Sequence, residues 1–235
     1  MDMSTVKIIL ALAATWGVGA KHGDILNAYV KADKEADLEI LLQVPKRMDV
    51  SGDTVKELEA TNVSELALQL RKSLYVLKQA GRLWSQLLHT RLLDAGFQQC
   101  ELDMCLYWKQ DGSDLVVVGV YVDDLLETGT YAAAVNRFFT SLAMSIKDLG
   151  PVNNFLGMRV AVDDDGSYVI DQEGAISDLL REHGLDDANS TRNLIGANCY
   201  EVPTTDSALL ISEEGGSPSI RSFQSLVGSL LWVAR

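Results

Sequence analysis

The amino-acid sequence predicts an α+β fold in which helices cover one face of an antiparallel sheet. Two features favour this class: stretches with strand and helix periodicity alternate along the 235 residues, and strand-like stretches follow one another across short turns. A hydrophobic content of 47% and only four prolines are typical of a folded chain with a sizeable core. We therefore expect a folded body built from local hairpins and amphipathic helices.

The first element is predicted to be a core helix at about residues 5–16. One helical face carries apolar or small residues at Val6, Ile9, Leu10, Ala13 and Gly17. The same stretch resembles a secretion signal, with Lys7 before an apolar run, but Asp2 weakens that resemblance. The run is also shorter than the about 20 apolar residues that cross a bilayer. We favour the core helix over a signal or a membrane segment.

Later elements follow from the same local patterns. Strands are predicted in the apolar stretches at residues 21–30, 104–110 and 115–122, and a hairpin at residues 160–172. Helices are predicted where apolar residues recur every three or four positions, at residues 84–95, 135–142, 176–183 and 223–234. Residues 31–65 are charged and contain turn signals, and residues 201–219 are loop-like.

The three cysteines indicate a reducing, intracellular environment. Cys100, Cys105 and Cys199 form no CxxC motif and leave one thiol unpaired, so neither a disulfide framework nor a zinc ribbon is expected. His89 with Cys100 and Cys105 could be imagined as metal ligands, but buried thiols are the commoner arrangement.

Two adjacent aspartates interrupt an apolar run at residues 115–129, LVVVGVYVDDLLETG. The strand before them and the leucines after them place Asp123 and Asp124 at the tip of a predicted hairpin. Two carboxylates about 4 Å apart repel by on the order of 4 kcal/mol at an effective dielectric constant of about 20, so such a cluster binds a cation or a proton. Asp24 would supply further oxygen ligands suited to Mg²⁺. Spacing alone leaves open whether these residues meet or whether the pair is an ordinary turn.

A second acidic cluster, Asp163, Asp164 and Asp165, does not fit the calcium-binding EF-hand pattern. If Asp163 and Asp165 are loop positions 3 and 5, Ala161 and Gln172 stand at the two positions that need carboxylates. We therefore predict an exposed hairpin turn and no metal site.

Charge is distributed unevenly along the chain. The formal net charge is −13, which by itself argues against a nucleic-acid partner. Residues 66–93, however, contain no Asp or Glu and carry five cations: Arg71, Lys72, Lys78, Arg82 and Arg91. This basic segment is compatible with phosphate contacts, and equally with a solvated surface.

Four motifs in order along the chain resemble the reverse transcriptase of copia-type LTR retrotransposons. They are GDILNAYV (23–30), LYVLKQAGRLW (74–84), YVDD (121–124) and KDLGPVNNFLGMRV (147–160). The final SFQSLVGSLLWVAR (222–235) is similar to the segment that precedes the ribonuclease H region in those Gag-Pol polyproteins. The resemblance covers nearly the whole chain.

This resemblance implies a right-hand polymerase. Residues 1–160 would form the palm with partial fingers, the fingers insert lying at about residues 31–75, and residues 161–235 a thumb or connection-like segment. The implied activity is RNA-directed DNA polymerisation with two Mg²⁺ ions, or Mn²⁺. The implied partners are an RNA or DNA template with its primer, a dNTP and other polyprotein segments, with no membrane. The implied location is cytoplasmic, in a virus-like particle.

Individual residues match positions of known role in the family. Asp24, Asp123 and Asp124 match its metal-binding and catalytic triad. Tyr29 stands where an aromatic ring crowds the 2′ position of the nucleotide sugar. Lys78 and Gln79 match the segment lining the nucleotide and template pocket, and the range 155–157 (Phe-Leu-Gly) matches a hairpin that grips the primer end.

The chain also departs from the family. Val76 and Gly81 replace a usual glycine and proline, and the valine is expected to narrow the nucleotide site. Family members carry further finger strands upstream and ribonuclease H downstream, so a fragment or a decayed copy is expected. Two alternatives to an active polymerase therefore stay open: a non-catalytic remnant that binds nucleic acid or a partner subunit, and a small acidic module with a structural Asp-Asp turn.

Overall fold

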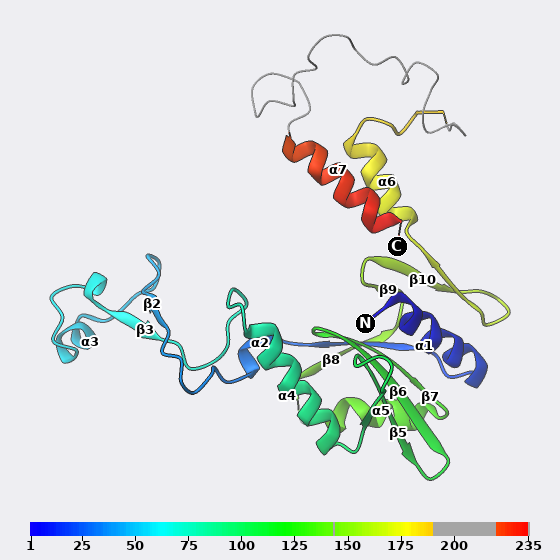
Figure 1. Cartoon of the computed structure of the whole chain (residues 1–235), viewed down its shortest axis with the longest axis horizontal. Helices are drawn as coiled ribbons and strands as arrows, with labels where there is room; N and C mark the ends of the chain where they lie inside the picture. The colour runs from blue at the N-terminus through cyan, green and yellow to red at the C-terminus, as the bar shows by residue number, and fades with distance from the viewer. Residues whose placement is uncertain (143, 190–219, 235) are drawn as a thin grey trace. The chain divides into compact units, whose positions relative to one another are not determined.

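The computed structural model describes residues 1–142, 144–189 and 220–234 (Figure 1). The chain divides into two compact units, Met1–Val152 and Asn153–Arg235. Residues 201–219 and Cys199 lie outside the described residues. Every helix in the described part of the chain is too short or too polar to cross a lipid bilayer.

The first unit is built on a six-stranded sheet in the order β4-β5-β6-β7-β1-β8, and each neighbouring pair is antiparallel. Its strands are β1 (Lys21–Ile25), β4 (Gln98–Gln99), β5 (Leu106–Asp111), β6 (Asp114–Tyr121), β7 (Asp124–Gly129) and β8 (Ile146–Pro151). The expected α+β class with an antiparallel sheet is confirmed. The first strand in the sequence lies between β7 and β8, so tertiary pairing brings it beside the Asp-Asp hairpin.

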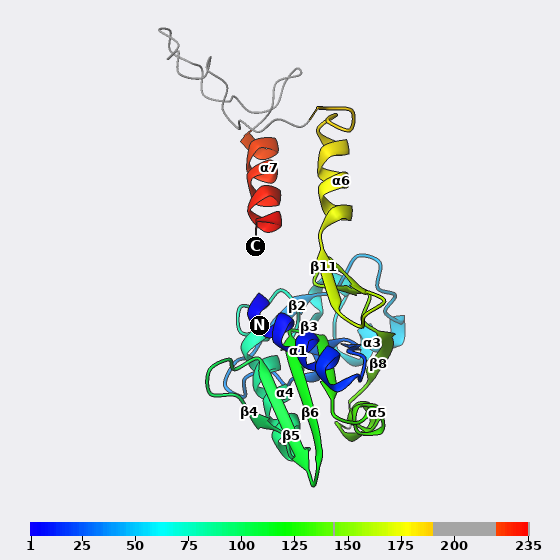
Figure 2. The same cartoon turned by 90° about the vertical axis from the view of Figure 1, so that its right-hand side faces the viewer.

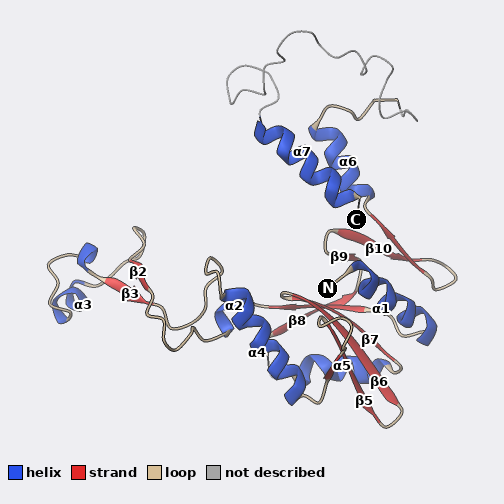
Figure 3. Cartoon of the chain, viewed as in Figure 1, coloured by secondary structure: helices blue, strands red, loops and turns tan. Residues whose placement is uncertain are grey.

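Helices cover both faces of this sheet, which corrects the expectation of one covered face (Figure 3). Side chains alternate between faces along a strand. A side chain added at Gly119 would meet Ile9 of α1 (Met3–Trp16), whereas one added at Gly129 would meet Val135 of α5 (Ala132–Ser141). Gly119 pairs with Leu126, three positions before Gly129, so the two helices lie on opposite faces. The physical reason is that residues on both faces of β6 and β7 are buried, so each face of the sheet needs a cover.

One hydrophobic cluster lies between the sheet and the helices α4 (Ala80–Asp94) and α5, while α1 buries its own apolar residues on the other face. It is formed by buried apolar residues from both layers, among them Ile25, Trp84, Leu88, Leu92, Val118, Leu125, Phe138 and Leu142. The apolar faces predicted for residues 84–95 and 135–142 therefore pack as expected. This packing orients α4 toward the end of the sheet that carries the Asp-Asp turn.

The segment between α2 (Ala28–Lys31) and α4 contains a two-stranded sheet and short helices. Its elements are β2 (Leu41–Gln43), α3 (Gly52–Glu57), the 3₁₀ helix η1 (Val63–Glu65) and β3 (Ala67–Gln69). No residue of α3 or η1 is buried. The charged texture of residues 31–65 thus corresponds to an exposed insert.

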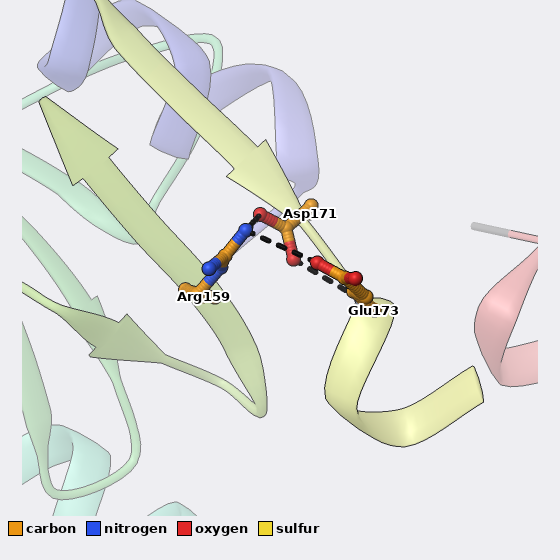
Figure 4. A network of polar contacts seen from close by, with 3 residues as sticks. All are labelled: Arg159, Asp171 and Glu173. Atoms are coloured by element: carbon orange, nitrogen blue, oxygen red, sulfur yellow. Dashed lines mark hydrogen bonds and ion pairs between the residues drawn. The ribbon is translucent and has the colours of Figure 1, made fainter. Parts of the chain in front are cut away.

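The second unit has a three-stranded sheet in the order β11-β10-β9 and two helices. Its elements are β9 (Asn154–Phe155), β10 (Met158–Val162), β11 (Tyr168–Asp171), α6 (Glu173–Glu182) and α7 (Ile220–Val233). Figure 2 shows α6 and α7 alongside one another. Arg159 on β10 binds Asp171 at 2.8 Å and Glu173 at 3.3 Å (Figure 4), so one guanidinium ties the hairpin to the start of α6.

Candidate functional site

Strand pairing brings the three predicted aspartates together at one end of the six-stranded sheet. On β1, Asp24 is the register partner of Asp124 on β7, although the two lie far apart in sequence. Asp123 occupies the turn between β6 and β7, and its carbonyl accepts a hydrogen bond of 2.9 Å from the Ile25 amide. The site therefore depends on the long-range pairing of β1 with the hairpin.

The turn itself has only two residues, Val122 and Asp123, because Tyr121 and Asp124 are already a register pair. Val122 has a φ of 56°, in the left-handed region that two-residue hairpin turns usually fill with glycine. A β-branched residue there carries strain of roughly 1–3 kcal/mol. The Nε1–H of Trp84 donates a hydrogen bond of 2.7 Å to the Val122 carbonyl.

Electrostatic repulsion is built into this cluster. Burial raises the pKa of the Asp123 carboxyl, its own backbone amide partly offsets this, and the charges of Asp124 and Asp24 raise it further. A cation held by the three carboxylates would relieve this repulsion. Their oxygens are the ligand type that Mg²⁺ prefers. The donor chemistry thus fits a divalent metal ion.

His22 is a site residue that the sequence analysis missed. Its Nε2 lies 2.8 Å from Oδ1 of Asp124, and the side chains of His22 and Asp124 are 15% and 32% exposed. The signal was available, because His22 precedes Asp24 by two positions on one strand and so shares its face. Among the described residues, no three carboxylate, histidine or cysteine side chains converge as a preformed metal site. Full coordination would need side-chain rotation, and would compete with His22 for Asp124.

Tyr29 lies close to the hairpin, on the short helix α2. Its ring packs edge-on against Tyr75 with centroids 4.6 Å apart. Both Tyr29 and Trp84 line a cavity of about 260 Å³ that also contacts Tyr121 and Val122 of the hairpin. An aromatic ring therefore stands at the same cavity as the Asp-bearing turn.

Lys78 and Gln79 lie just before α4 and do not line that cavity; Lys78 is exposed and Gln79 is the N-cap residue of the helix. Val76 is 89% exposed and does not line that cavity, and its effect on a bound nucleotide stays a prediction. An added side chain at Gly81 would meet no atom within 4 Å. Gly81 itself lines the cavity beside Tyr29 and Trp84.

The basic segment is partly neutralised within the first unit. Lys72 forms an ion pair of 2.6 Å with Asp33, and Arg82 forms one with Glu35. Both acids come from the start of the insert. The net positive charge that this segment has available for phosphate contacts is therefore smaller than its count of Lys and Arg residues indicates.

The second acidic cluster is an exposed turn, as predicted. Asp163, Asp164 and Asp165 are all exposed between β10 and β11. Asp165 accepts a hydrogen bond of 2.9 Å from the Ser167 amide, and hydrogen bonding to Ser167 lowers the pKa of its carboxyl. The turn thus engages one carboxylate oxygen of Asp165, and the cluster belongs to the second unit.

Glu127 is a buried acid that the sequence analysis did not single out. It lies on β7 opposite Lys21 of β1 and is fully buried, and neither carboxyl oxygen has a hydrogen-bond partner among the described residues. Burial raises its pKa to about 9; the charge of Lys21 opposes this rise and that of Asp148 adds to it. Glu127 is therefore neutral at pH 7. An acid inside the apolar run after the Asp-Asp pair was the available signal.

The sequence of the chain is similar to those of known retrotransposon proteins. The family model described as "Reverse transcriptase (RNA-dependent DNA polymerase)" matches residues 1–195. The chain is 26% identical over 240 residues to the Retrovirus-related Pol polyprotein from transposon TNT 1-94 of Nicotiana tabacum, covering 99% of this chain and 17% of that protein. It is 27% identical over 234 residues to the Pol polyprotein from transposon RE1 of Arabidopsis thaliana, covering 98% and 14% respectively. A putative transposon Ty5-1 protein of Saccharomyces cerevisiae is 29% identical over 171 residues, 71% of this chain and 52% of that protein. The chain thus spans a minor part of the two polyproteins.

Proposed function

The chain belongs to the reverse transcriptase (RNA-dependent DNA polymerase) family of copia-type retrotransposons, and from this membership we propose that it carries the nucleotidyl-transfer centre of an RNA-directed DNA polymerase. The observation that carries the proposal is the register pairing of Asp24 with Asp124 beside the turn that holds Asp123. The transfer joins the primer 3′-oxygen to the α-phosphate of a dNTP and releases pyrophosphate. The template is RNA or DNA, and other segments of a polyprotein are the proposed partners.

In this proposal the three aspartates hold two divalent cations. Bound Mg²⁺ or Mn²⁺ supplies activation of the attacking hydroxyl and neutralisation of charge on the leaving oxygen. Asp24 and Asp124 offer carboxylates from paired strands, and Asp123 offers one from the turn between them. The protein's own contribution is to bring the backbone of the three aspartates together through strand pairing and the turn, so that only their side chains need to rotate to hold the ions.

Tyr29 is proposed to select deoxynucleotides. Its place at the cavity beside Tyr121 and Val122 supports this role. A ring against the sugar 2′ position leaves no room for the hydroxyl that distinguishes ribose. Lys78 and Gln79 are proposed to contact the nucleotide or template from the segment before α4, as the family resemblance implies.

The fold divides in this proposal as a right-hand polymerase does. The six-stranded sheet with its helices is the palm, extending to about residue 160, and the exposed insert at about residues 31–75 is part of the fingers. Residues 161–235 are the thumb or connection-like segment. The antiparallel sheet with an Asp-bearing hairpin supports the assignment of the palm.

A second candidate is a non-catalytic remnant that binds nucleic acid or a partner subunit. One observation favours it: Nε2 of His22 lies 2.8 Å from Oδ1 of Asp124, so a metal ion at Asp124 would have to compete with this contact. A chain of this kind would bind a primer–template without extending the primer.

Primer extension separates the two candidates. Extension of a labelled primer on RNA and on DNA templates is measured with Mg²⁺ and with Mn²⁺, together with primer–template binding by fluorescence anisotropy. Asp123→Asn should lower extension by at least about a hundredfold. It should leave binding largely intact, because phosphate contacts by Lys and Arg dominate affinity. Binding without extension by the parent would favour the remnant, and undiminished extension by Asp123→Asn would exclude Asp123 from catalysis.

A further inference from the structure

The two peptide groups on either side of the Asp123 Cα atom are each tied to another element. The Val122 carbonyl, in the preceding peptide, accepts the hydrogen bond from Trp84 on α4. The Asp123 carbonyl, in the following peptide, accepts the bond from the Ile25 amide next to Asp24. Because these two peptide planes determine the φ and ψ angles of Asp123, the two bonds together set the direction of its Cβ atom.

The donor on α4 is itself held firmly. Trp84 is 2% exposed and belongs to the core cluster that contains Ile25, Ala28 and Leu88. Its ring cannot turn without disturbing close-packed neighbours. Its N–H donates a hydrogen bond to a backbone carbonyl of the hairpin, and a buried indole N–H needs such an acceptor.

The acceptor lies in a turn that needs restraint. Val122 is in the left-handed region at a φ of 56°, and its side chain is 38% exposed, so packing of that side chain does little to hold it. A strained backbone persists only where its surroundings determine it. The Trp84 bond supplies such a restraint at the strained residue.

We propose that Trp84 is a positioning residue for the metal-binding centre, acting through the Val122 carbonyl to aim the Asp123 carboxylate at the position shared with Asp24 and Asp124. The proposal rests on the proposed function, since it assigns Trp84 a part in that same site. A purely structural Trp84 would affect the stability of the chain and leave metal affinity and turnover unchanged once the chain is folded.

The test replaces only the donor. Incorporation of 3-benzothienylalanine at Trp84 substitutes sulfur for the indole N–H and keeps the shape of the ring; Trp84→Phe is the genetically encoded counterpart. Trp108→Phe is the matched control, because Trp108 on β5 is half-buried and its indole donates no hydrogen bond to any residue that the structure describes. Circular dichroism and the Tm of each variant establish that it is folded.

Mn²⁺ affinity of the free chain is the first readout. Loss of the donor should weaken Mn²⁺ binding by about 10–100-fold, the range found when groups that orient metal ligands are removed. The Trp84 indole resonance, identified among the four tryptophans of an ¹⁵N-labelled chain by its absence in Trp84→Phe, should show slow hydrogen exchange in the parent.

Extension kinetics give the second readout. The kcat for nucleotide addition should fall by about 10–100-fold with the analogue, since a small misplacement of a reacting group is enough. The dNTP KM and the primer–template Kd should stay close to the parent values. The control Trp108→Phe should match the parent in all measurements.

The outcomes separate the two proposals. A parent that neither binds Mn²⁺ nor extends a primer overturns the proposed function and the positioning role together. A parent that does both, alongside a folded 3-benzothienylalanine variant with unchanged Mn²⁺ affinity and kcat, overturns only the role of Trp84.

Discussion

At the scale of single residues, Glu127 shows how the sheet imposes an unusual state on one side chain. The residue sits in the buried part of β7, where burial raises its pKa to about 9. A neutral carboxyl without a hydrogen-bond partner among the described residues is costly, because desolvation of a polar group is not repaid. Its burial therefore makes the stability of the chain depend on pH.

The unfolding free energy should fall as pH rises from about 4.5 to about 9, because folded Glu127 keeps a proton that the unfolded chain has lost. The slope contributed by this residue is at most on the order of 1.4 kcal/mol per pH unit. Urea denaturation at pH 6 and pH 8 measures it. Glu127→Leu should flatten the slope and raise stability at pH 8. Glu127→Gln should flatten the slope without that gain, and a parent with no slope between these pH values would contradict the prediction.

The Tyr29 side chain should determine sugar selection if it has the proposed role. Tyr29→Ala should keep dNTP addition and raise the ratio of rNTP to dNTP kcat/KM by about tenfold or more, since the space beside the 2′ position has opened. Single-nucleotide addition measures both terms. Tyr131→Ala, at a position that is 64% exposed before α5, is the control and should leave the ratio unchanged. An unchanged ratio in Tyr29→Ala would remove this residue from the nucleotide site.

At the scale of elements, α1 and α4 show how backbone angles determine whether a glycine-to-alanine substitution stabilises or destabilises the chain. Gly81 is in the first turn of α4 and Gly17 is the C-cap of α1, and an added side chain meets no atom within 4 Å at either position. Gly17 has a φ of 64°, whereas Gly81 is in helical backbone. An added side chain has room at both positions, so the two substitutions should differ in their effect on stability only through the backbone conformation.

Gly81→Ala should raise the unfolding free energy by about 0.5–1 kcal/mol, because alanine loses less conformational entropy in a helix. Gly17→Ala should lower it by about 1 kcal/mol, because a side chain disfavours the left-handed region. Urea denaturation of both variants gives the comparison. If both variants changed the unfolding free energy in the same direction, contacts outside the two helices would determine the effect.

At the scale of the whole molecule, the two acidic clusters lie in different compact units. The carboxylates of the first unit repel one another, whereas Asp165 in the second unit is satisfied by its own turn. Metal affinity should therefore belong to the first unit alone.

Replacing Asp163, Asp164 and Asp165 together by Ser should leave Mn²⁺ affinity within about twofold of the parent, because exposed turn carboxylates bind a cation weakly in water. Isothermal titration with Mn²⁺ measures this, and Asp123→Asn serves as the variant in which affinity is expected to fall. Loss of Mn²⁺ binding in the triple variant would show that the metal binds in the second unit.

The α+β class, the order of most elements and the kinds of residue at the candidate site could be predicted from the sequence. Amphipathic periodicity is local, so α4, α5 and the β5–β6 hairpin could be predicted from neighbouring residues. The exposed turn at residues 163–165 followed from turn chemistry alone. The match to family motifs identifies Asp24, Asp123, Asp124 and Tyr29 as candidate site residues from the sequence alone.

Which of these residues come into contact follows from the three-dimensional fold and could not be predicted from the sequence. The position of β1 between β7 and β8 pairs Asp24 with Asp124, and no local pattern encodes a pairing across so many residues. The contact of His22 with Asp124 and the bond from Trp84 to Val122 follow from that pairing and from the packing of α4. The second helical cover, α1, follows from the two apolar faces of the sheet. Strand register and helix packing join residues through burial of the whole core, which periodicity along the chain does not specify.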